Sequence, residues 1–326
     1  MVKYIIKRLL LSLLILFGVS VIIYVLVRMM PLTAIEKNLD MNALNYEETK
    51  KNLYAYYGLE VTPTFKGVVT GYFGWLGRFL SGDFGTMIVD QKPVAMEILE
   101  HIPLSFTISF ISLILQLIIA IPLGIKCACN QYGKLDYFST VLTMIGISFP
   151  SFFFAGLIIK LFGSTLGWFP LFGLHTSGLS GWAYFADMAW HLVLPIFVLV
   201  ILSVGSMMRY TRTNTLEVLN ADYIRTARAK GLSESKVVYK HVFRNTMIPL
   251  VTTLAGILPG LFGGSMITEQ VFGLPGIGQV AYQACLDGEI SLVMAYNMFI
   301  AVLTVIGILL TDVMYAVVDP RVKLGS

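Results

Sequence analysis

Charged side chains are scarce in this chain of 326 residues: Asp, Glu, Lys and Arg make up 13% of it, whereas 56% is hydrophobic. The mean hydropathy of +0.78 lies far outside the range of soluble globular domains. The composition therefore excludes a soluble protein and predicts a chain surrounded largely by lipid. The net charge of +4 is a modest and unevenly distributed excess, and we expect no nucleic-acid partner.

Motifs that would make the chain an enzyme are also missing. No GxxxxGK[ST] loop occurs, and the only Gly-Lys pair, Gly133-Lys134, is followed by leucine, so the chain does not cradle ATP by that route. Four scattered histidines without HExxH spacing argue against a zinc enzyme, no GxSxG motif marks a hydrolase, and three cysteines predict no disulfide framework. We interpret His191 as a boundary residue rather than a nickel ligand. We therefore expect no catalytic residue, metal or cofactor in this chain.

Six apolar stretches are long enough to cross a bilayer. A helix rises about 1.5 Å per residue, so roughly 20 residues span a hydrocarbon core about 30 Å thick. None of the six contains Lys, Arg, Asp or Glu, each of which costs roughly 2.5–3.5 kcal/mol at the centre of an inserted helix. The stretches are 9–27, 102–125, 138–159, 192–208, 247–267 and 292–311. They predict an all-α integral membrane protein with six transmembrane helices, the first of them uncleaved because no small-residue cleavage site follows it.

The basic residues predict how these helices are oriented, because short loops rich in Lys and Arg stay in the cytoplasm. Eight basic residues lie between Arg209 and Arg244, whereas the outer loops 163–187 and 268–291 hold none. Both termini are therefore expected in the cytoplasm. The predicted organisation is a first helix with a basic N-terminus at 1–30, an extracytoplasmic loop at 31–101, a five-helix core at 102–318 with a cytoplasmic loop at 209–246, and a cytoplasmic tail at 319–326.

The long outer loop is the one sizeable segment expected outside the membrane. Glu47, Glu48, Lys50 and Lys51 predict a solvated helix there, and the glycine- and aromatic-rich stretch 71–77 predicts turns. The pattern leaves open whether this loop is a docking surface or a lid.

The cytoplasmic loop is too polar for lipid and too regular for a linker. Asp222 is placed to cap a short helix that ends near Lys230, where Gly231 supplies a left-handed exit, and Ser233 is placed to cap a second helix. A small apolar stripe on the first helix lets its backbone approach another protein closely. The stripe consists of Ile224, Ala227 and Gly231. A basic helix lying on anionic lipid has the same pattern, so the pattern alone leaves both interpretations open.

The segments DYIRTARAKGLS at 222–233 and HVFRNTMIP at 241–249 resemble the cytoplasmic loop of ABC importer permeases, in the branch that transports dipeptides, oligopeptides or nickel. Shorter similar motifs extend the resemblance along most of the chain. They are GDFGT at 82–86, Pro93 with EIL at 97–99, HIP at 101–103, GWFP at 167–170, EVL at 217–219, VFGLPGIG at 271–278 and DPRV at 319–322. In that family the loop contains a coupling helix that sits in a groove of the ATP-binding subunit.

The resemblance implies a set of residues that couple this chain to an ATPase subunit. They are Asp222, Tyr223, Arg225, Thr226, Ala227, Arg228, Lys230, Gly231, Leu232 and Ser233. The broader family has Glu-Ala-Ala where this chain has Arg225-Thr226-Ala227, so a contact through glutamate is not carried over, whereas Ala227 and Gly231 are. Phe243-Arg244 stands in place of a later Leu-Pro, which matches the peptide and nickel branch better than the sugar or amino-acid branches.

The resemblance also implies partners and a location. These are a second homologous permease subunit, two ATP-binding subunits that hold ATP and Mg, an extracytoplasmic substrate-binding protein, and the lipid bilayer of a bacterial cytoplasmic membrane. Peptides are the favoured substrate because no predicted span offers a cluster of His or Cys for a soft metal. Nickel or another small solute remains the alternative.

Transmitting motion from a coupling helix requires bends and close packing in the adjoining spans. Pro195, Pro249 and Pro259 are interpreted as bends. Gly256, Gly260 and Gly264 form two overlapping GxxxG spacings that are expected to pack the fifth span against a neighbour.

A secondary carrier is the main rival interpretation, since coupling ions need ionisable residues inside spans. Asp312 is the only near candidate, at the cytoplasmic end of the sixth predicted span, and a helix-end contact is favoured for it over a proton relay. A purely structural scaffold subunit, the third interpretation, does not need a coupling helix.

Overall fold

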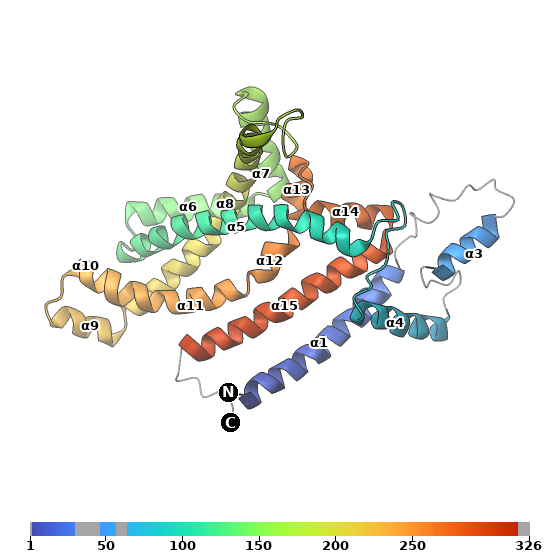
Figure 1. Ribbon diagram of the computed structural model, residues 1–326. Helices are drawn as coiled ribbons and strands as arrows, with labels where there is room; N and C mark the ends of the chain where they lie inside the picture. Colours follow the sequence, from blue (N-terminus) through green and yellow to red (C-terminus); the bar gives the residue numbers. More distant parts are fainter. Residues whose placement is uncertain (1, 30–45, 57–63, 319–326) are drawn as a thin grey trace.

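The computed structural model describes residues 2–29, 46–56 and 64–318, and the regular structure in these segments is helical, apart from one isolated antiparallel bridge between Thr86 and Pro93 (Figure 1). The predicted tail 319–326 lies outside the described residues. The helices are α1 Val2–Arg28, α3 Tyr46–Tyr56, α4 Phe65–Leu80, α5 Val94–Cys129, α6 Lys134–Ser148, α7 Ser151–Ile158, the π-helical η1 Ile159–Thr165, α8 Gly181–Leu219, α9 Asp222–Ala229, α10 Glu234–Lys236, the π-helical η2 Val237–Val242, α11 Phe243–Ala255, α12 Leu258–Gly263, α13 Met266–Phe272, α14 Ile277–Asp287 and α15 Ile290–Val318.

Within the described residues, four helices are long and apolar enough to cross a membrane. They are Ile6–Arg28, Val94–Cys129, Gly181–Leu219 and Ile290–Met314. These helices confirm the predicted spans 9–27, 102–125, 192–208 and 292–311, although α5 and α8 extend well beyond the predicted ends. A bent pair made of α6 and α7 with η1 would add a fifth crossing.

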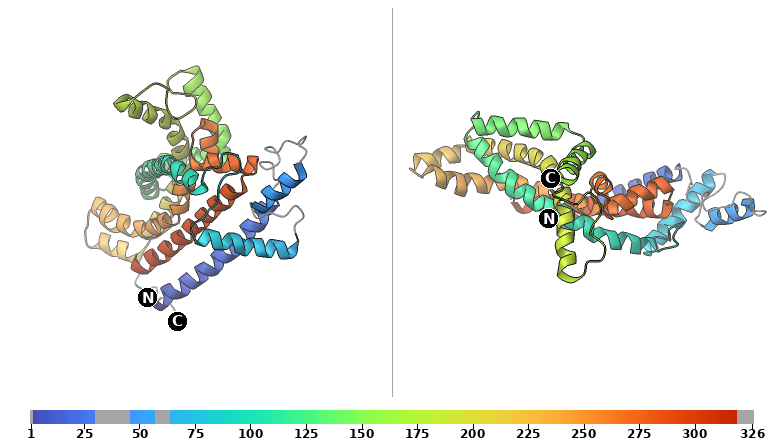
Figure 2. Two further views of the ribbon diagram at one scale, coloured as in Figure 1. Left: turned by 45° about the vertical axis from the view of Figure 1, so that its right-hand side comes forward. Right: turned by 90° about the horizontal axis from the view of Figure 1, so that it is seen from above.

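The helices form a layered arrangement in which α15 lies between α1 on one side and α11 and α12 on the other (Figures 1 and 2). The α5–α8 pair packs most closely at Gly124, where an added Cβ would lie 2.7 Å from the Met208 carbonyl oxygen and 2.8 Å from the Cβ of Thr211. A glycine is therefore needed for the two backbones to approach this far. Such close approach through small residues is typical of helices packed within membranes.

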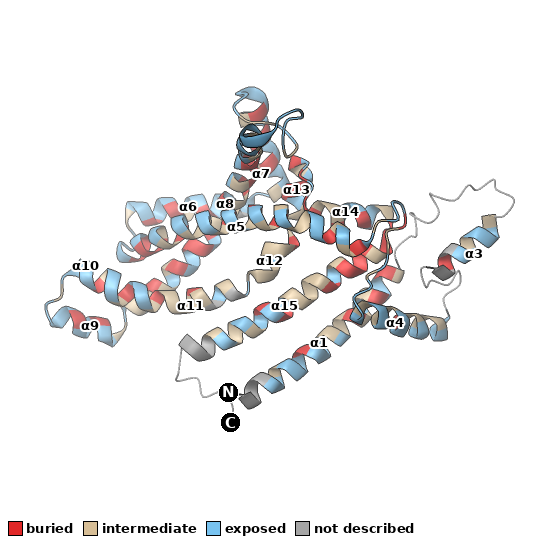
Figure 3. Cartoon of the chain, in the orientation of Figure 1, coloured by how far each residue is buried: buried red, intermediate tan, exposed pale blue. Residues whose placement is uncertain are grey.

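Exposed residues occur along much of this assembly (Figure 3), and many of them are large and apolar. On α1, for example, Leu10, Leu13 and Leu14 are each more than 60% exposed. An apolar surface of this extent is a liability in water but is the expected exterior of a chain whose solvent is lipid. The exposed face of α1 therefore supports the membrane assignment.

The third predicted span, 138–159, is not one straight helix. The chain bends by 101° between α6 and α7. Phe149 is extended at the break, with φ −82° and ψ 132°, because the following Pro150 disfavours the helical conformation of the residue before it. The prediction of a continuous third helix is therefore wrong.

The fifth predicted span, 247–267, is also broken. It is divided among α11, α12 and α13, none of which has the roughly 20 residues needed to cross a bilayer alone. Pro259 lies in the first turn of α12, and Gly264 has a left-handed φ of +72° that ends it. The run 247–267 is apolar, as predicted, but Pro259 and Gly264 divide it into separate helices.

The segment before α5 is more ordered than its sequence predicts. The solvated helix expected around Glu47 is confirmed by α3. Residues 71–77, predicted as turns, lie instead within α4, because Tyr72 is buried against α1 and the packing of this face outweighs the low helix propensity of the glycines. The next segment is fixed by Glu289, whose carboxylate accepts hydrogen bonds from the Ile88 and Val89 amides at 2.6 and 2.8 Å.

Candidate functional site

The helix expected to contact an ATPase subunit is α9, which follows α8 directly. Ala221, not Asp222, occupies the N-cap, and no side chain caps this end. The capping prediction is therefore wrong, although Asp222 lies in the first turn, where a negative charge interacts favourably with the helix dipole. Gly231 has a φ of +76°, which confirms the predicted left-handed exit. Ser233 is the N-cap residue of α10, but its side chain makes no capping hydrogen bond.

The apolar stripe of α9 faces inward rather than toward a partner. Ile224 has no exposed surface and Ala227 is 7% exposed, and both pack with Val237 and Val242 of η2. The prediction that they present a smooth surface to another protein is therefore wrong. Gly231 is exposed, with no atom within 4 Å of the position of an added Cβ. The loop thus has a small core of its own, and this core holds α9 in place.

The other face of α9 points away from this core. The Arg225 side chain is 72% exposed and Tyr223 is 49% exposed. The remaining residues named from the family resemblance are exposed on or after this helix, except for the half-buried Leu232. The exposed ones are Asp222, Thr226, Arg228, Lys230, Gly231 and Ser233.

An ion pair closes the turn between α9 and α10. The Arg228 guanidinium donates to both carboxylate oxygens of Glu234, from Nη2 at 2.6 Å and from Nε at 3.2 Å. This hydrogen bonding lowers the pKa of the Glu234 carboxyl and raises the pKa of Arg228. Since both side chains are substantially exposed, solvent screens the pair and its contribution to stability is small.

A more buried pair anchors α8 ahead of this loop. Arg212 of α8 donates from Nε and Nη2 to the two carboxylate oxygens of Asp136 in α6, both at 2.7 Å. The Tyr132 amide donates to the same carboxylate at 3.0 Å. Asp136 is 4% exposed, so its charge is compensated within the protein. This arrangement fixes the last turns of α8, from which α9 extends.

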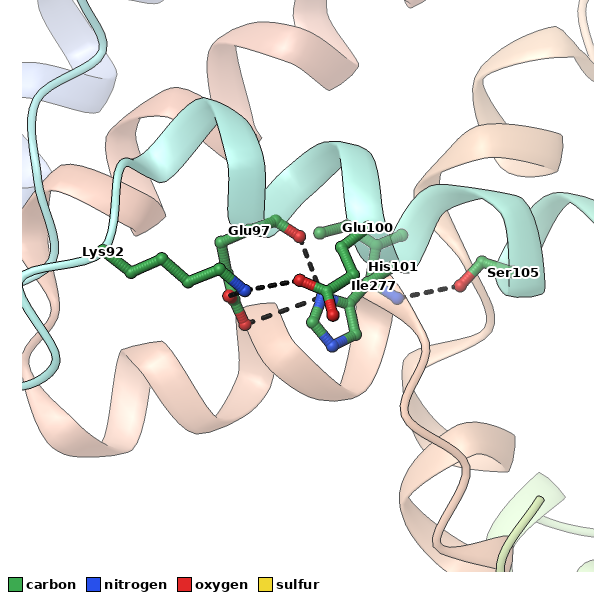
Figure 4. Close-up of polar contacts among 6 residues, drawn as sticks. All are labelled: Lys92, Glu97, Glu100, His101, Ser105 and Ile277. Atoms are coloured by element: carbon green, nitrogen blue, oxygen red, sulfur yellow. Dashed lines mark hydrogen bonds and ion pairs between the residues drawn. The ribbon is translucent and has the colours of Figure 1, made fainter. Parts of the chain in front are cut away.

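A second constellation surrounds Glu269 of α13, which has no exposed surface. Its carboxylate accepts hydrogen bonds from the Ser105 hydroxyl at 2.8 Å, the Ser265 amide at 3.1 Å and the Gln279 amide at 3.0 Å. The Ser105 oxygen in turn accepts from the Ile277 amide at 2.9 Å, as Figure 4 shows. One carboxylate therefore joins α5, the turn before α13 and the start of α14.

Glycines form the walls of this site. A Cβ added to Gly264, Gly276 or Gly278 would lie 2.6, 2.5 or 2.8 Å from the nearest carboxylate atom of Glu269. Any side chain at these positions would displace the carboxylate. The hydropathy pattern does not mark Glu269, because the predicted fifth span ends at residue 267. The signal that marks the site is the glycine-rich motif at 271–278, which begins two residues after the glutamate.

A surface cluster lies on α5 one turn before Ser105. Lys92 Nζ is 2.6 Å from Glu97 and 2.5 Å from Glu100, and His101 Nδ1 lies 2.8 Å from the Glu97 carbonyl oxygen (Figure 4). Hydrogen bonds to Glu100 and Glu97 raise the pKa of Lys92 to about 12. The cluster links the segment before α5 to the first turns of that helix.

The residues predicted to bend and pack the spans have separate positions. Pro195 is buried inside α8. The three glycines do not form one packing face. Gly256 follows α11, and its added Cβ would lie 3.4 Å from the Thr253 carbonyl oxygen and 4.0 Å from Thr311 Oγ1 of α15. Gly260 has no atom within 4 Å of an added Cβ, and Gly264 contacts Glu269. The close approach to α15 is made by Gly263 instead, where a Cβ would lie 2.9 Å from Ile300 Cδ1. The GxxxG prediction is therefore wrong, because the helix ends between Gly260 and Gly264.

Asp312 forms an ion pair with Arg8 at 3.0 Å, joining the last turns of α15 to the start of α1. This confirms the helix-end contact predicted for Asp312. His191 of α8 is buried, with Nδ1 2.9 Å from the Asp187 carbonyl oxygen. Across the described part of the chain, no three His, Cys, Asp or Glu side chains gather where they could hold a metal ion.

Comparison with known proteins places this geometry in a family. Residues 120–324 match the family described as the binding-protein-dependent transport system inner membrane component. The chain is 37% identical over 324 residues to the oligopeptide transport system permease protein AppB of Bacillus subtilis, covering 99% of this chain and 100% of that protein. It is 34% identical to the dipeptide transport system permease protein DppB of Lactococcus lactis and 31% identical to DppB of Bacillus subtilis, in each case over 99% of this chain and at least 99% of the relative. The chain therefore belongs to the family of inner membrane components of binding-protein-dependent transport systems.

Proposed function

We propose that this chain is one of two permease subunits of an ABC importer that translocates di- or oligopeptides. As a member of its family the chain is a multi-pass permease of the inner membrane and not an enzyme, and ATPase activity lies in separate subunits. The peptide substrate is inferred from relatives whose names state oligopeptide or dipeptide transport. The described residues lack a cluster of metal ligands, so nickel has no separate support in the geometry.

The proposed topology retains six crossings with both termini in the cytoplasm. The four long helices supply the first, second, fourth and sixth crossings. The bent α6–α7 pair would supply the third, and α11 to α13 together would supply the fifth. In this arrangement α9 is cytoplasmic, and the α13–α14 segment around Glu269 lies toward the outer side, where a binding protein would deliver peptides.

The observation that carries the proposal is the way in which the rest of the chain holds α9 in place. Its inner face is fixed by the small core with η2, and the α8 end from which it extends is anchored by the Asp136–Arg212 pair. Its outer face is free to sit in a groove of an ATPase subunit. A helix held in this way transmits a displacement to α8 and α11 rather than absorbing it. ATP and Mg would be bound by the ATPase subunits alone.

A charge reversal on the outer face of α9 tests the coupling role. We expect Arg225→Glu to abolish co-purification of the ATPase subunits and to reduce ATP-dependent peptide uptake by about tenfold or more, since an interface charge reversal costs several kcal/mol. Lys134→Glu is the matched control: it makes the same charge change at an exposed residue of the other cytoplasmic connection. Equal ATPase binding by the two variants would contradict the assignment of α9.

The substrate is tested separately in proteoliposomes that contain both permeases, the ATPases and the binding protein. ATP-dependent accumulation of a labelled oligopeptide, unaffected by excess Ni²⁺, is the expected result. Accumulation of radioactive nickel without peptide uptake would instead establish the nickel alternative.

A further inference from the structure

Helix α4 has an apolar surface wider than its contact with α1. Tyr72 is buried and Trp75 and Phe79 are half-buried on the side that faces α1. A row of further apolar residues lies beside this contact, at spacings of four, four and seven, which places them along one edge of the helix. The row consists of Phe65, Val69, Phe73 and Leu80, which are 88%, 38%, 58% and 76% exposed. Together the two groups form a continuous apolar sector.

The remaining side of α4 is polar or lacks side chains. Its exposed residues are Lys66, Thr70, Gly74, Gly77 and Arg78. Two of them are basic, and α4 contains no Asp or Glu. An apolar sector with aromatic residues, opposed by a face with basic residues, is the pattern of helices that lie in a membrane interface.

The crossing point of α4 lies within the length of the α1 span, not beyond its end. The Tyr72 hydroxyl is 2.7 Å from the Ser20 hydroxyl. Ser20 precedes Arg28, the last residue of α1, by eight positions, which is about 12 Å along the helix. The apolar face of an interfacial helix is buried about 5–10 Å into the boundary between headgroups and acyl chains, a depth similar to this offset.

The exposed edge is also continuous with the lipid-facing surface of α1. Phe17 on α1 is 51% exposed, and its ring centroid is 6.0 Å from that of Tyr72. Tyr72 in turn contacts Phe73 at 5.2 Å. Figures 1 and 2 show α4 lying across the end of α1 that is remote from the N-terminus.

We propose that α4 is an interfacial helix that inserts this edge, Phe65, Val69, Phe73 and Leu80, among the acyl chains of the extracytoplasmic leaflet. The occupant of the edge is phospholipid, because the edge is apolar, continues the bilayer face of α1 and is flanked by basic rather than acidic residues. The inference rests on the proposed orientation of α1. It makes α4 a membrane-embedded brace for α1 rather than part of a freely solvated loop.

Two adjacent positions, one on the apolar edge of α4 and one on its polar side, provide a matched test. In a full-length chain whose cysteines are removed by Cys127→Ala, Cys129→Ala and Cys285→Ala, a fluorophore is attached at Phe73→Cys or at Gly74→Cys, and the protein is reconstituted in phosphatidylglycerol–phosphatidylethanolamine vesicles. Phospholipid that carries a nitroxide near the glycerol end of the acyl chain is expected to quench the label at position 73 more strongly than the label at position 74, by about threefold or more. Iodide added outside the vesicles is expected to show the reverse order.

Three outcomes would overturn the inference. Equal quenching of the two labels by iodide would place both faces of α4 in water. Protection of position 73 from both quenchers would show that protein covers the edge, and protection that appears only when the binding protein is added would make that protein the occupant. Because the measurement needs neither ATP nor the partner subunits, failure of peptide uptake in the proteoliposomes that contain both permeases, the ATPases and the binding protein would count against the proposed function and not against this inference.

Discussion

Glu269 and Glu234 carry the same carboxylate in opposite surroundings. Glu269 has no exposed surface and accepts hydrogen bonds from one hydroxyl and two backbone amides inside a wall of glycines. The Glu234 side chain is 60% exposed and forms an ion pair with Arg228. Burial without water makes every lost hydrogen bond costly, whereas an exposed pair can exchange its partner for solvent. The first region is therefore expected to be rigid and intolerant of change, and the second adaptable.

The largest difference is expected on removing each carboxylate in turn. Glu269→Ala leaves three buried donors without an acceptor, at about 1–3 kcal/mol each, so the free energy of unfolding should fall by roughly 3 kcal/mol or more. Glu234→Ala should lower it by less than about 1 kcal/mol. Thermal unfolding of the purified chain in detergent measures both. Similar melting temperatures for the two variants would remove the contrast between the regions.

A methyl group added to the wall of the Glu269 site should have the next largest effect. Gly276→Ala places a Cβ where it overlaps the carboxylate, and overpacking of this kind costs about 1–3 kcal/mol. Gly260→Ala is the control, because no atom lies within 4 Å of its added Cβ. The melting temperature should fall for the first variant only. An unchanged melting temperature for Gly276→Ala would show that the Glu269 carboxylate can move to make room for the added methyl group.

In the coupling loop, changes should displace α9 and so reduce transport, while the membrane-spanning helices stay in place. Ala227→Arg drives a long charged side chain into the core around Ile224, and Gly231→Pro removes the left-handed exit of α9. Membrane insertion should be unchanged in both, because neither residue lies in a span, while ATP-dependent uptake should fall by about tenfold or more. Uptake and ATP hydrolysis are measured in the same vesicles. Full uptake by either variant would contradict the coupling assignment.

The smallest expected effect is the pH dependence of the Arg228–Glu234 pair. The pKa of Glu234 is lowered in the folded chain, so the pair contributes fully above the unfolded pKa of about 4.5. Its contribution is lost as pH falls through the lower, folded value. A double-mutant cycle with Arg228→Ala and Glu234→Ala should give a coupling energy below about 1 kcal/mol at pH 7 that vanishes in strong acid. A coupling that persisted in strong acid would show that the carboxylate charge is not its source.

The parts of the fold that sequence predicted are those set by one long-range property, the length of an uninterrupted apolar run. It identified α1, α5, α8 and α15, and the local rule for glycine identified the exit at Gly231. It did not predict that α6 and α7 diverge at Phe149. Hydropathy is averaged over many residues and does not respond to Pro150, which changes the backbone conformation of the one residue before it.

The sequence did not predict which face of each helix is buried. Ile224 and Ala227 have the spacing of a docking stripe and also of a core stripe, and only the position of η2 decides between them. Residues 71–77 are predicted as turns because their glycines have a low helix propensity. The contact of Tyr72 with α1, which favours the helix, cannot be seen in the sequence. Glu269 is not predicted because the hydroxyl that binds it, on Ser105 of α5, lies 164 positions earlier in the sequence. These outcomes depend on tertiary contacts that periodicity does not contain.

The Arg8–Asp312 pair has a consequence for the biosynthesis of the chain. Its two residues are separated by roughly 300 positions, so at a ribosomal rate of about 5–20 residues per second Arg8 waits between about 15 and 60 s for its partner. During that interval α1 has already been made, while α15, the helix it packs against, has yet to be synthesised. Docking of α1 at this end therefore has to follow the insertion of α15, so this face of α1 is open to lipid until late in synthesis.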